Sequence, residues 1–228
     1  MRAMAQDAPL DTDQIATPGD ETPGEKLGRA ADAGAHGAGL DADLIRAIRE
    51  EVVSYGVRRA TAASIAARAG VHRVTLYRRG GGIRRLILDS LETVFTTIAS
   101  EQYAAASGSN GREFAADLTG RLIEALRAEP LFMAVVDHDP DLLLPYVVDR
   151  LGGSQQVIIA QLTPAIERGI ADGSVRACEA ERMARVIVHA CTPFVIGGRC
   201  LGELADPAEA RIEVRDLVEG YLRPPASK

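Results

Sequence analysis

The sequence predicts an all-α protein, with a three-helix helix-turn-helix unit near the N-terminus and a larger helical body after it. Three observations support this prediction. Apolar residues recur at helical spacing, and no run alternates with period two for long enough to form a sheet. Ala, Leu, Ile, Val and Arg dominate, whereas aromatic residues make up 4%. Residues 61–85 combine two short helical segments, a turn glycine and a basic bend.

The composition narrows the class of protein. A chain of 228 residues with 46% hydrophobic and 25% charged residues has room for one large globular domain or two small ones. No apolar run approaches the ~20 residues of a membrane span, and the N-terminus lacks the apolar part of a signal peptide. Cys178, Cys191 and Cys200 have no metal-type spacing. We expect a cytoplasmic protein without a metal or cofactor, in which these cysteines are buried apolar residues; a redox sensor is the alternative.

Residues 1–39 are expected to be a disordered acidic tail. They contain three prolines and almost no large apolar side chain, and acidic residues outnumber basic ones. Such a segment cannot bury enough surface to offset its chain entropy. An arm that touches DNA is the alternative, which the negative charge disfavours.

Residues 40–85 are expected to form the helix-turn-helix domain. Asp41 can cap a first helix that has an apolar stripe and ends at Gly56. Thr61 can cap the second, and Ala66 is small enough to let two helices cross closely. Gly70 can adopt the left-handed conformation that ends a helix. A third helix then starts at His72 or Arg73. The alternative is an ordinary helical hairpin.

Arginine is concentrated in the same segment. Between Leu40 and Ser90 there are ten arginines and five acidic residues, within a chain whose formal net charge is −6. A localised basic surface on an acidic protein is what phosphate binding requires. A solvated charged face is the alternative, but such faces usually mix both signs.

Residues 86–228 are expected to form the body. A long helix over 83–106 leads into it, followed by a helix over 113–129 and shorter pieces over 130–136 and 141–151, broken by Pro140 and Pro145. Ser154 can cap a helix that runs to 170. Residues 179–199 are apolar nearly all round, with a kink expected at Pro193, and Pro207 opens the last helix.

Thirteen residues between about Leu40 and Leu91 make a specific pattern: Ile45, Ala47, Gly56, Thr61, Ile65, Ala66, Ala69, Gly70, Val71, Thr75, Leu76, Tyr77 and Leu86. With the helix order, this pattern resembles the TetR (tetracycline-repressor-like) family of transcriptional regulators. The resemblance implies an all-α homodimer that is not an enzyme. Its first three helices would bind a double-stranded DNA operator, and its body would bind a small-molecule effector and dimerise. We expect the last two helices to form the dimer interface, because residues 179–199 are apolar nearly all round; burial within the monomer is the alternative.

The resemblance also implies the DNA contacts. Residues at the Thr75 and Tyr77 positions typically contact phosphates, and those at Arg73 and Val74 typically face the major groove. Arg73 is our candidate base reader, because arginine can make a bidentate contact to guanine. The full set of candidates is Thr61, His72, Arg73, Val74, Thr75, Tyr77, Arg78, Arg79 and Arg84.

The sequence departs from the family pattern after Tyr77. Relatives usually carry an aromatic residue where Gly80 stands and a phosphate-contacting lysine where Ile83 stands. The neighbouring arginines, or the free amides of a glycine bend at a helix start, could replace that charge. We expect DNA binding to survive with a looser connection between the third and fourth helices.

An effector is expected to bind between the body helices and to act on the distal end of the long helix that starts at Ile83. The candidate lining residues are apolar apart from two anchors, Tyr146 and His189, and therefore indicate a largely apolar ligand. They are Phe114, Leu118, Phe132, Val136, Leu143, Tyr146, Ile159, Leu162, Met183, Ile187, His189 and Phe194. For each of them, ordinary core packing is the competing interpretation.

Two other functions are considered. An enzyme or metal site could use His138 within the run from Asp137 to Asp141, but the spacing matches no metal motif and favours a polar turn in which Asp139 or Asp141 caps the next helix. A helical sensor that has lost DNA binding and acts through protein partners is the other alternative, supported by the departures at Gly80 and Ile83.

Overall fold

The computed structural model describes residues 42–80 and 82–225, apart from the side chains of 77–80, 198 and 199. The expected disorder of residues 1–39 and the expected cap at Asp41 lie outside this part. The described residues form helices connected by turns and contain no strand, which confirms the all-α prediction. No helix among them combines the length and apolarity that crossing a membrane requires.

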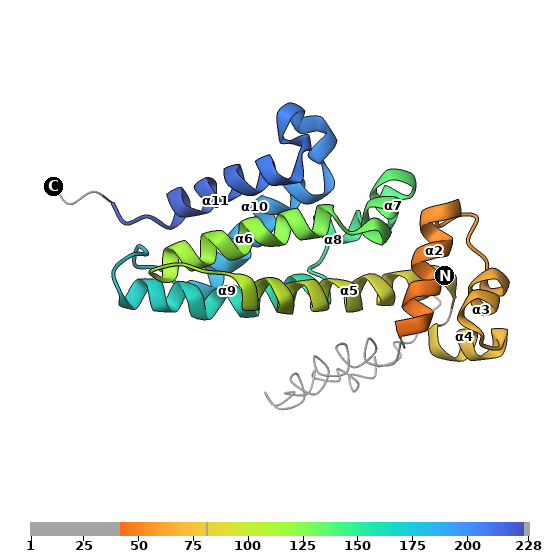
Figure 1. The fold of residues 1–228 in the computed structure, drawn as a ribbon. Helices are drawn as coiled ribbons and strands as arrows, with labels where there is room; N and C mark the ends of the chain where they lie inside the picture. The colour runs from red at the N-terminus through yellow and green to blue at the C-terminus, as the bar shows by residue number, and fades with distance from the viewer. Residues whose placement is uncertain (1–41, 81, 226–228) are drawn as a thin grey trace, which may run out of the picture. The chain divides into compact units, whose positions relative to one another are not determined.

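Four helices form the N-terminal part (Figure 1): α2 (Ala42–Tyr55), α3 (Ala62–Ala69), α4 (Arg73–Gly80) and the long α5 (Ile83–Ala105). Their inward stripes meet in what we call the N-terminal core. Its fully buried large side chains are Leu44, Ile48, Ile65, Leu76, Leu86, Ile87 and Leu131. Leu131 comes from α7 (Pro130–His138), so this core includes a helix from later in the chain.

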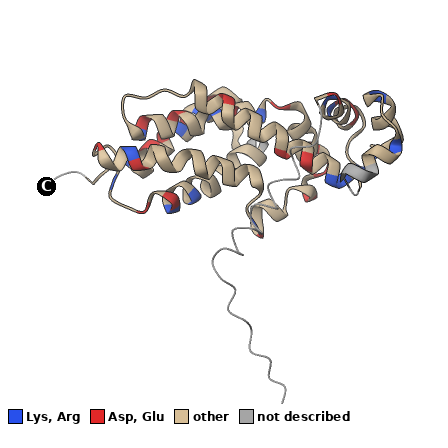
Figure 2. Ribbon diagram, turned by 90° about the horizontal axis from the view of Figure 1, so that it is seen from below, with Lys and Arg blue, Asp and Glu red and all other residues tan. Residues whose placement is uncertain are grey.

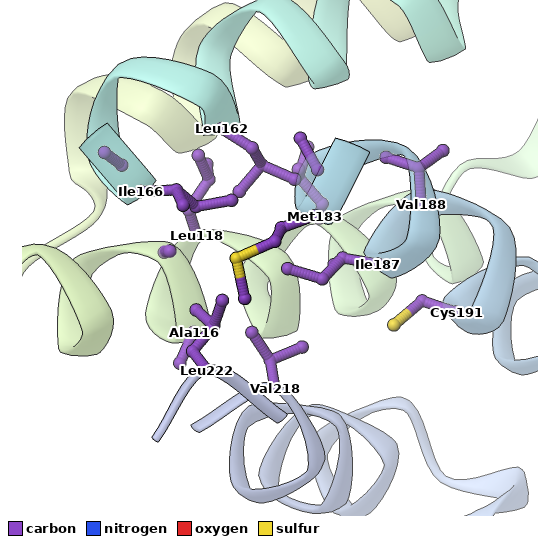
Figure 3. Packing of buried hydrophobic residues seen from close by; sticks show 14 of the residues in the cluster. Ala116, Leu118, Leu162, Ile166, Met183, Ile187, Val188, Cys191, Val218 and Leu222 are labelled. Atoms are coloured by element: carbon purple, nitrogen blue, oxygen red, sulfur yellow. The ribbon is translucent and has the colours of Figure 1, made fainter. Parts of the chain in front are cut away.

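The body consists mainly of α6 (Gly111–Arg127), α9 (Gly153–Ala171), α10 (Ala180–Ile196) and α11 (Pro207–Leu222). Between α7 and α9 lie a 3₁₀ turn, Pro140–Leu142, and the four-residue α8 (Pro145–Val148). A second 3₁₀ segment, Gly198–Ala205, leads to α11. The apolar faces of α6, α9, α10 and α11 meet in the body core, where Met183 lies between Leu118, Ile187 and Val218 (Figure 3).

Helix limits differ from expectation at four places. Helix α6, expected to start at residue 113, begins at Gly111, because the Asn110 side chain accepts a hydrogen bond from Glu113 N (2.9 Å) and caps it. Ser154 is not a cap, since α9 begins one residue earlier. Residues 141–151, expected to be one short helix, contain only the end of the 3₁₀ turn and α8. Helix α10 continues through Pro193 and ends at Ile196, before the expected end at 199.

Candidate nucleic-acid interface and effector cavity

The turn between α3 and α4 has the geometry that the sequence predicts. Thr61 Oγ1 accepts a hydrogen bond from Ser64 N (3.1 Å) and caps α3. Gly70 ends the helix with φ 67° and ψ 26°, a left-handed conformation that glycine adopts without steric cost. Val71 N donates to Ala66 O (3.0 Å), and the Ala66 side chain is buried at the crossing. Local capping therefore fixes how the two helices meet.

The first turn of α4 is the exposed part of this unit. His72 and Arg73 are exposed, and Val74 is 76% exposed although it is apolar. Thr75 is half-buried and Leu76 is fully buried in the N-terminal core. The helix is thus anchored by Leu76 and presents residues 72–74 to a partner.

The other DNA-binding candidates have different settings. Thr61 is exposed, but its hydroxyl is used as the α3 cap. Arg84 is exposed in the first turn of α5, where an N-terminal helix dipole favours anions. The side chains of Tyr77, Arg78 and Arg79 lie outside the described part of the chain.

Part of the positive charge in this region is neutralised within the protein. Arg46, Arg49, Arg58, Arg68 and Arg85 all form ion pairs with carboxylates. Arg68 Nε, for example, lies 2.9 Å from Oε2 of the buried Glu51, which also accepts from the Ser64 hydroxyl. The basic surface is therefore narrower than the arginine count suggested, because acidic residues from α2, α5 and the ends of α7 occupy five of the ten guanidinium groups.

Three described arginines of this region remain without an acidic partner among residues 42–80 and 82–225. They are Arg59, Arg73 and Arg84, and all three are exposed. Figure 2 shows the Lys and Arg positions of the segment that carries α2 to α4, at the right of the view. Positive charge is thus available beside the exposed turn of α4 and at the start of α5.

Both ends of α7 are tied to this helix-turn-helix unit. Glu129, just before α7, accepts hydrogen bonds from Leu131 N (3.1 Å) and from Arg49 Nη2 of α2 (3.1 Å). Asp139, just after α7, accepts from Val57 N (3.1 Å) and from Arg58 Nε (2.9 Å). A movement of α7 would therefore be transmitted to α2 and to the turn that follows it.

This arrangement corrects the prediction for the acidic run around His138. Asp139 makes no side-chain cap to the 3₁₀ turn, because its carboxylate reaches the α2–α3 turn instead. His138 is exposed. Within the described residues, no group of three His, Cys, Asp or Glu side chains could hold a metal ion.

The connection between α4 and α5 differs from the family pattern in its chemistry as well as its sequence. Gly82 has φ 142° and ψ 160°, which residues with a side chain rarely adopt. Ile83 is half-buried and packs against the N-terminal core. It cannot replace a phosphate-contacting lysine, so any such contact here must come from Arg84 or from the neighbouring arginines.

The body contains a cavity of about 160 Å³ between α5, α6, α7, α8, α9 and α10. Four of the predicted lining residues are present: Phe132, Leu143, Tyr146 and Leu162. Phe132 packs edge-to-face against Phe95 of α5, with ring centroids 5.1 Å apart. The cavity lies along the half of α5 nearest the helix-turn-helix unit, residues 85–95, rather than at its distal end as expected.

The other predicted lining residues lie elsewhere. Leu118, Ile159, Met183 and Ile187 are buried in the body core, and Figure 3 shows Leu118, Met183 and Ile187 pointing toward one another. Phe114 packs on Tyr103 (5.4 Å), Val136 packs on the N-terminal core, Phe194 on the body core, and His189 is exposed. For these eight side chains, packing or solvent exposure is the arrangement observed.

Sequence reasoning missed the α5 wall of the cavity. Five lining residues recur there at helical spacing: Arg85, Leu88, Asp89, Glu92 and Phe95. A signal was present, because charged residues on the inward stripe of a helix are unusual unless they are paired or functional. Thr119, Thr192 and residues 152–155 complete the polar part of the lining.

The three cysteines have different environments and form no disulfide. Cys191 lines the cavity, and burial raises the pKa of its thiol to about 12. Cys178 is half-buried, and a hydrogen bond from Arg182 (3.1 Å) lowers the pKa of its thiol. Cys200 is exposed. The interpretation as buried apolar residues is therefore correct for Cys191 only.

The chain is similar to known regulators in sequence. No family model matches it. Uncharacterized HTH-type transcriptional regulators of Mycobacterium bovis and Mycobacterium tuberculosis are 31% identical to it over 179 residues, which is 78% of this chain and 92% of each relative.

Solved structures show the same architecture. QsdR, a TetR-family repressor from R. erythropolis, has a TM-score of 0.52 at 17% identity, over 81% of this chain and 98% of that one. FadR from Bacillus subtilis, solved in complex with stearoyl-CoA, has a TM-score of 0.53 at 13% identity, over 79% and 98%. At these identities the structural likeness concerns the fold alone.

Proposed function

The chain belongs to the HTH-type transcriptional regulators, and we propose that it is a cytoplasmic repressor of the TetR type, released from its operator by a small, largely apolar effector. Like its relatives it is a regulator of transcription and not an enzyme. The proposal covers the repressor role, the effector class and the residues that carry them.

The observation that carries the proposal is the exposed, unpaired arginine at the start of α4. Arg73 has no acidic partner among the described residues and stands beside the exposed Val74. In a recognition helix, such a pair suits bidentate binding of guanine and apolar contact with a thymine methyl group. Arg84, at the start of α5, is placed to bind a phosphate.

We propose that two copies associate through α10 and α11. Large apolar side chains are exposed on both helices: Val186 (43%), Ile212 (54%) and Leu217 (45%). Their burial in a four-helix bundle would remove this apolar surface from water. Light scattering should return a dimer, and Leu217→Glu should convert it to a monomer; a monomeric parent protein would contradict both the interface and the reading of two half-sites.

The effector is proposed to act through α5 and α7 together. A dimer binds two half-sites about 34–36 Å apart, so a change in the separation of its two α4 helices would lower its affinity for DNA. Phe95 of α5 and Phe132 of α7 meet at the cavity, and Glu129 and Asp139 tie α7 to the helix-turn-helix unit. An effector that binds more tightly to a conformation in which these rings pack differently would stabilise that conformation and so release the DNA. The stearoyl-CoA complex of FadR supports a body of this fold that accepts a ligand with a long apolar chain.

A band-shift assay with the region upstream of the protein's own gene tests DNA binding. We expect a shift that weakens steeply with salt. Arg73→Ala should weaken the free energy of DNA binding by about 1–3 kcal/mol and reduce the preference for one base at the contacted position. Arg168→Ala, an exposed arginine on α9 outside the proposed interface, is the matched control and should change little. A folded dimer that gives no shift at low salt would instead support the sensor that lost DNA binding, whose support is the departure from the family pattern at Gly80 and Ile83.

A further inference from the structure

The charged residues that line the effector cavity carry an excess of negative charge. They are Arg85, Asp89 and Glu92, all on α5. Arg85 Nε is held by Asp89 Oδ1 at 2.9 Å, and the Arg85 side chain is 55% exposed, so its charge is already compensated. Glu92 has no hydrogen bond or ion pair from its side chain to any described residue. One carboxylate of the lining is therefore left without a counter-ion.

The Glu92 carboxylate also lies over the start of α9. A Cβ added to Gly153 would collide with Glu92 Oε1, so glycine is what permits this close approach. The N-terminal amides of a helix attract negative charge, and here they face a carboxylate of the protein itself. An anionic ligand would have to displace Glu92 from this position or lie beside it.

Two hydroxyl groups of the lining, those of Thr119 and Thr192, are left as acceptors. Thr119 Oγ1 donates its proton to Ala115 O (2.7 Å), and Thr192 Oγ1 donates to Val188 O (2.8 Å). A hydroxyl has a single proton, so both oxygens have only lone pairs left. Gln155 is also engaged, since it donates to Tyr146 O (3.3 Å) and accepts from Gly152 N (2.8 Å).

From this inventory we infer that the cavity selects an effector whose polar end donates hydrogen bonds, and most favourably a cation such as a primary alkylammonium. Carboxylates and other anions are disfavoured, because the lining has one carboxylate without a described partner, while its single arginine is paired with Asp89. A volume of about 160 Å³ accommodates an apolar body of roughly a dozen non-hydrogen atoms. This inference rests on the proposed function, since it takes the cavity to be the effector site.

Calorimetric titration of the full-length protein with three eight-carbon probes tests the inference at neutral pH. The probes are n-octylamine, n-octanol and sodium octanoate, which share an apolar chain and differ in the charge of the head group. We expect octylammonium to bind about tenfold or more tightly than octanoate, with octanol between them. Glu92→Gln should reduce this ratio to about threefold or less. Glu101→Gln, on the exposed side of the same helix, is the matched control and should keep the full ratio.

Two results would overturn the inference: octanoate binding as tightly as octylammonium, or a preference that Glu92→Gln leaves intact. Circular dichroism of each variant shows whether it is folded. A band-shift assay on the same samples separates this inference from the proposed function. If octanol binds without a charge preference and DNA binding is intact, only the head-group inference fails. If no probe binds, the effector site itself is wrong, and loss of DNA binding as well would remove the proposed function.

Discussion

The helix-turn-helix unit and the effector cavity are assembled from the sequence in opposite ways. The unit is built from consecutive residues, and its turn depends on local interactions of Thr61, Ala66 and Gly70. The cavity takes its walls from six helices, within residues 85–196. The comparison teaches that a site made by local geometry can be predicted from spacing, whereas a site made by packing cannot.

The two regions also differ in what happens to their charges. At the helix-turn-helix unit, the buried Glu51 of α2 and the buried Asp139, which reaches the unit from the end of α7, are both paired with arginines. In the cavity, Glu92 is left without a described partner. Glu92 is half-buried, and removing an unpaired charge even partly from water is costly, so a carboxylate in this position is a candidate for ligand binding rather than for stability.

The largest expected effect tests the packing of the body core, where helices far apart in sequence meet. Met183→Ala removes a fully buried side chain between α6, α10 and α11, and should lower the free energy of unfolding by about 2–5 kcal/mol. Urea unfolding followed by circular dichroism measures this change. Val148→Ala, at a side chain that is 66% exposed, is the control and should have little effect. An equal loss in both variants would contradict the packing described.

The next test breaks the link between the two regions. Asp139→Ala leaves Val57 N without its acceptor and Arg58 without its partner, which should cost about 1–3 kcal/mol in unfolding free energy. It should also weaken the effect of a cavity ligand on DNA affinity, because one end of α7 is no longer tied to the unit. Asp141→Ala changes an exposed residue of the same type and is the control. An unchanged free energy of unfolding would show that the contacts of Asp139 with Val57 N and Arg58 do not stabilise the fold.

A pair of glycine substitutions sharpens the contrast between turn and helix. Gly70→Ala should destabilise the protein by about 1–2 kcal/mol, because an alanine is strained at φ 67°. Gly220→Ala lies within α11 with nothing close to the added methyl group, and should stabilise it by roughly 0.5–1 kcal/mol. Thermal unfolding of both variants shows whether each is less or more stable than the parent protein. A change in the same direction for both would contradict the conformational explanation.

The smallest effect concerns acid stability in the body. Burial alone would raise the pKa of Asp117, but hydrogen bonds from Arg121 (2.7 Å), Ser107 N (3.0 Å) and Arg211 outweigh it and lower this pKa. The carboxylate therefore stabilises the fold fully above the ordinary aspartate pKa of about 3.9, and this stabilisation is lost as pH falls through the lowered value. Asp117→Asn should flatten the fall in stability below about pH 4 in urea titrations at several pH values. Asp216→Asn, at an exposed position, should keep the parent profile.

Several features of the fold could be predicted because they depend on residues close in sequence. Helical spacing and the glycines and prolines predicted the order of the helices. The Thr61 cap and the Gly70 turn were predicted correctly because capping involves residues within one helical turn. The cap at Ser154 was predicted wrongly, because Gly152, two residues earlier, can also precede a helix and is the N-cap observed. Sequence patterns locate the end of a helix only to within one or two residues.

The sequence by itself determined an all-α regulator with a helix-turn-helix unit and an exposed Arg73. Only the tertiary structure decided which arginines remain available and which residues line the cavity. The Arg58–Asp139 pair joins residues 81 positions apart, so counting charges along the chain could not reveal that this arginine is paired. Apolar stripes have the same spacing whether they close into a core, as at Met183, or leave a space, as at Phe132, because periodicity specifies which face is buried and not what it meets.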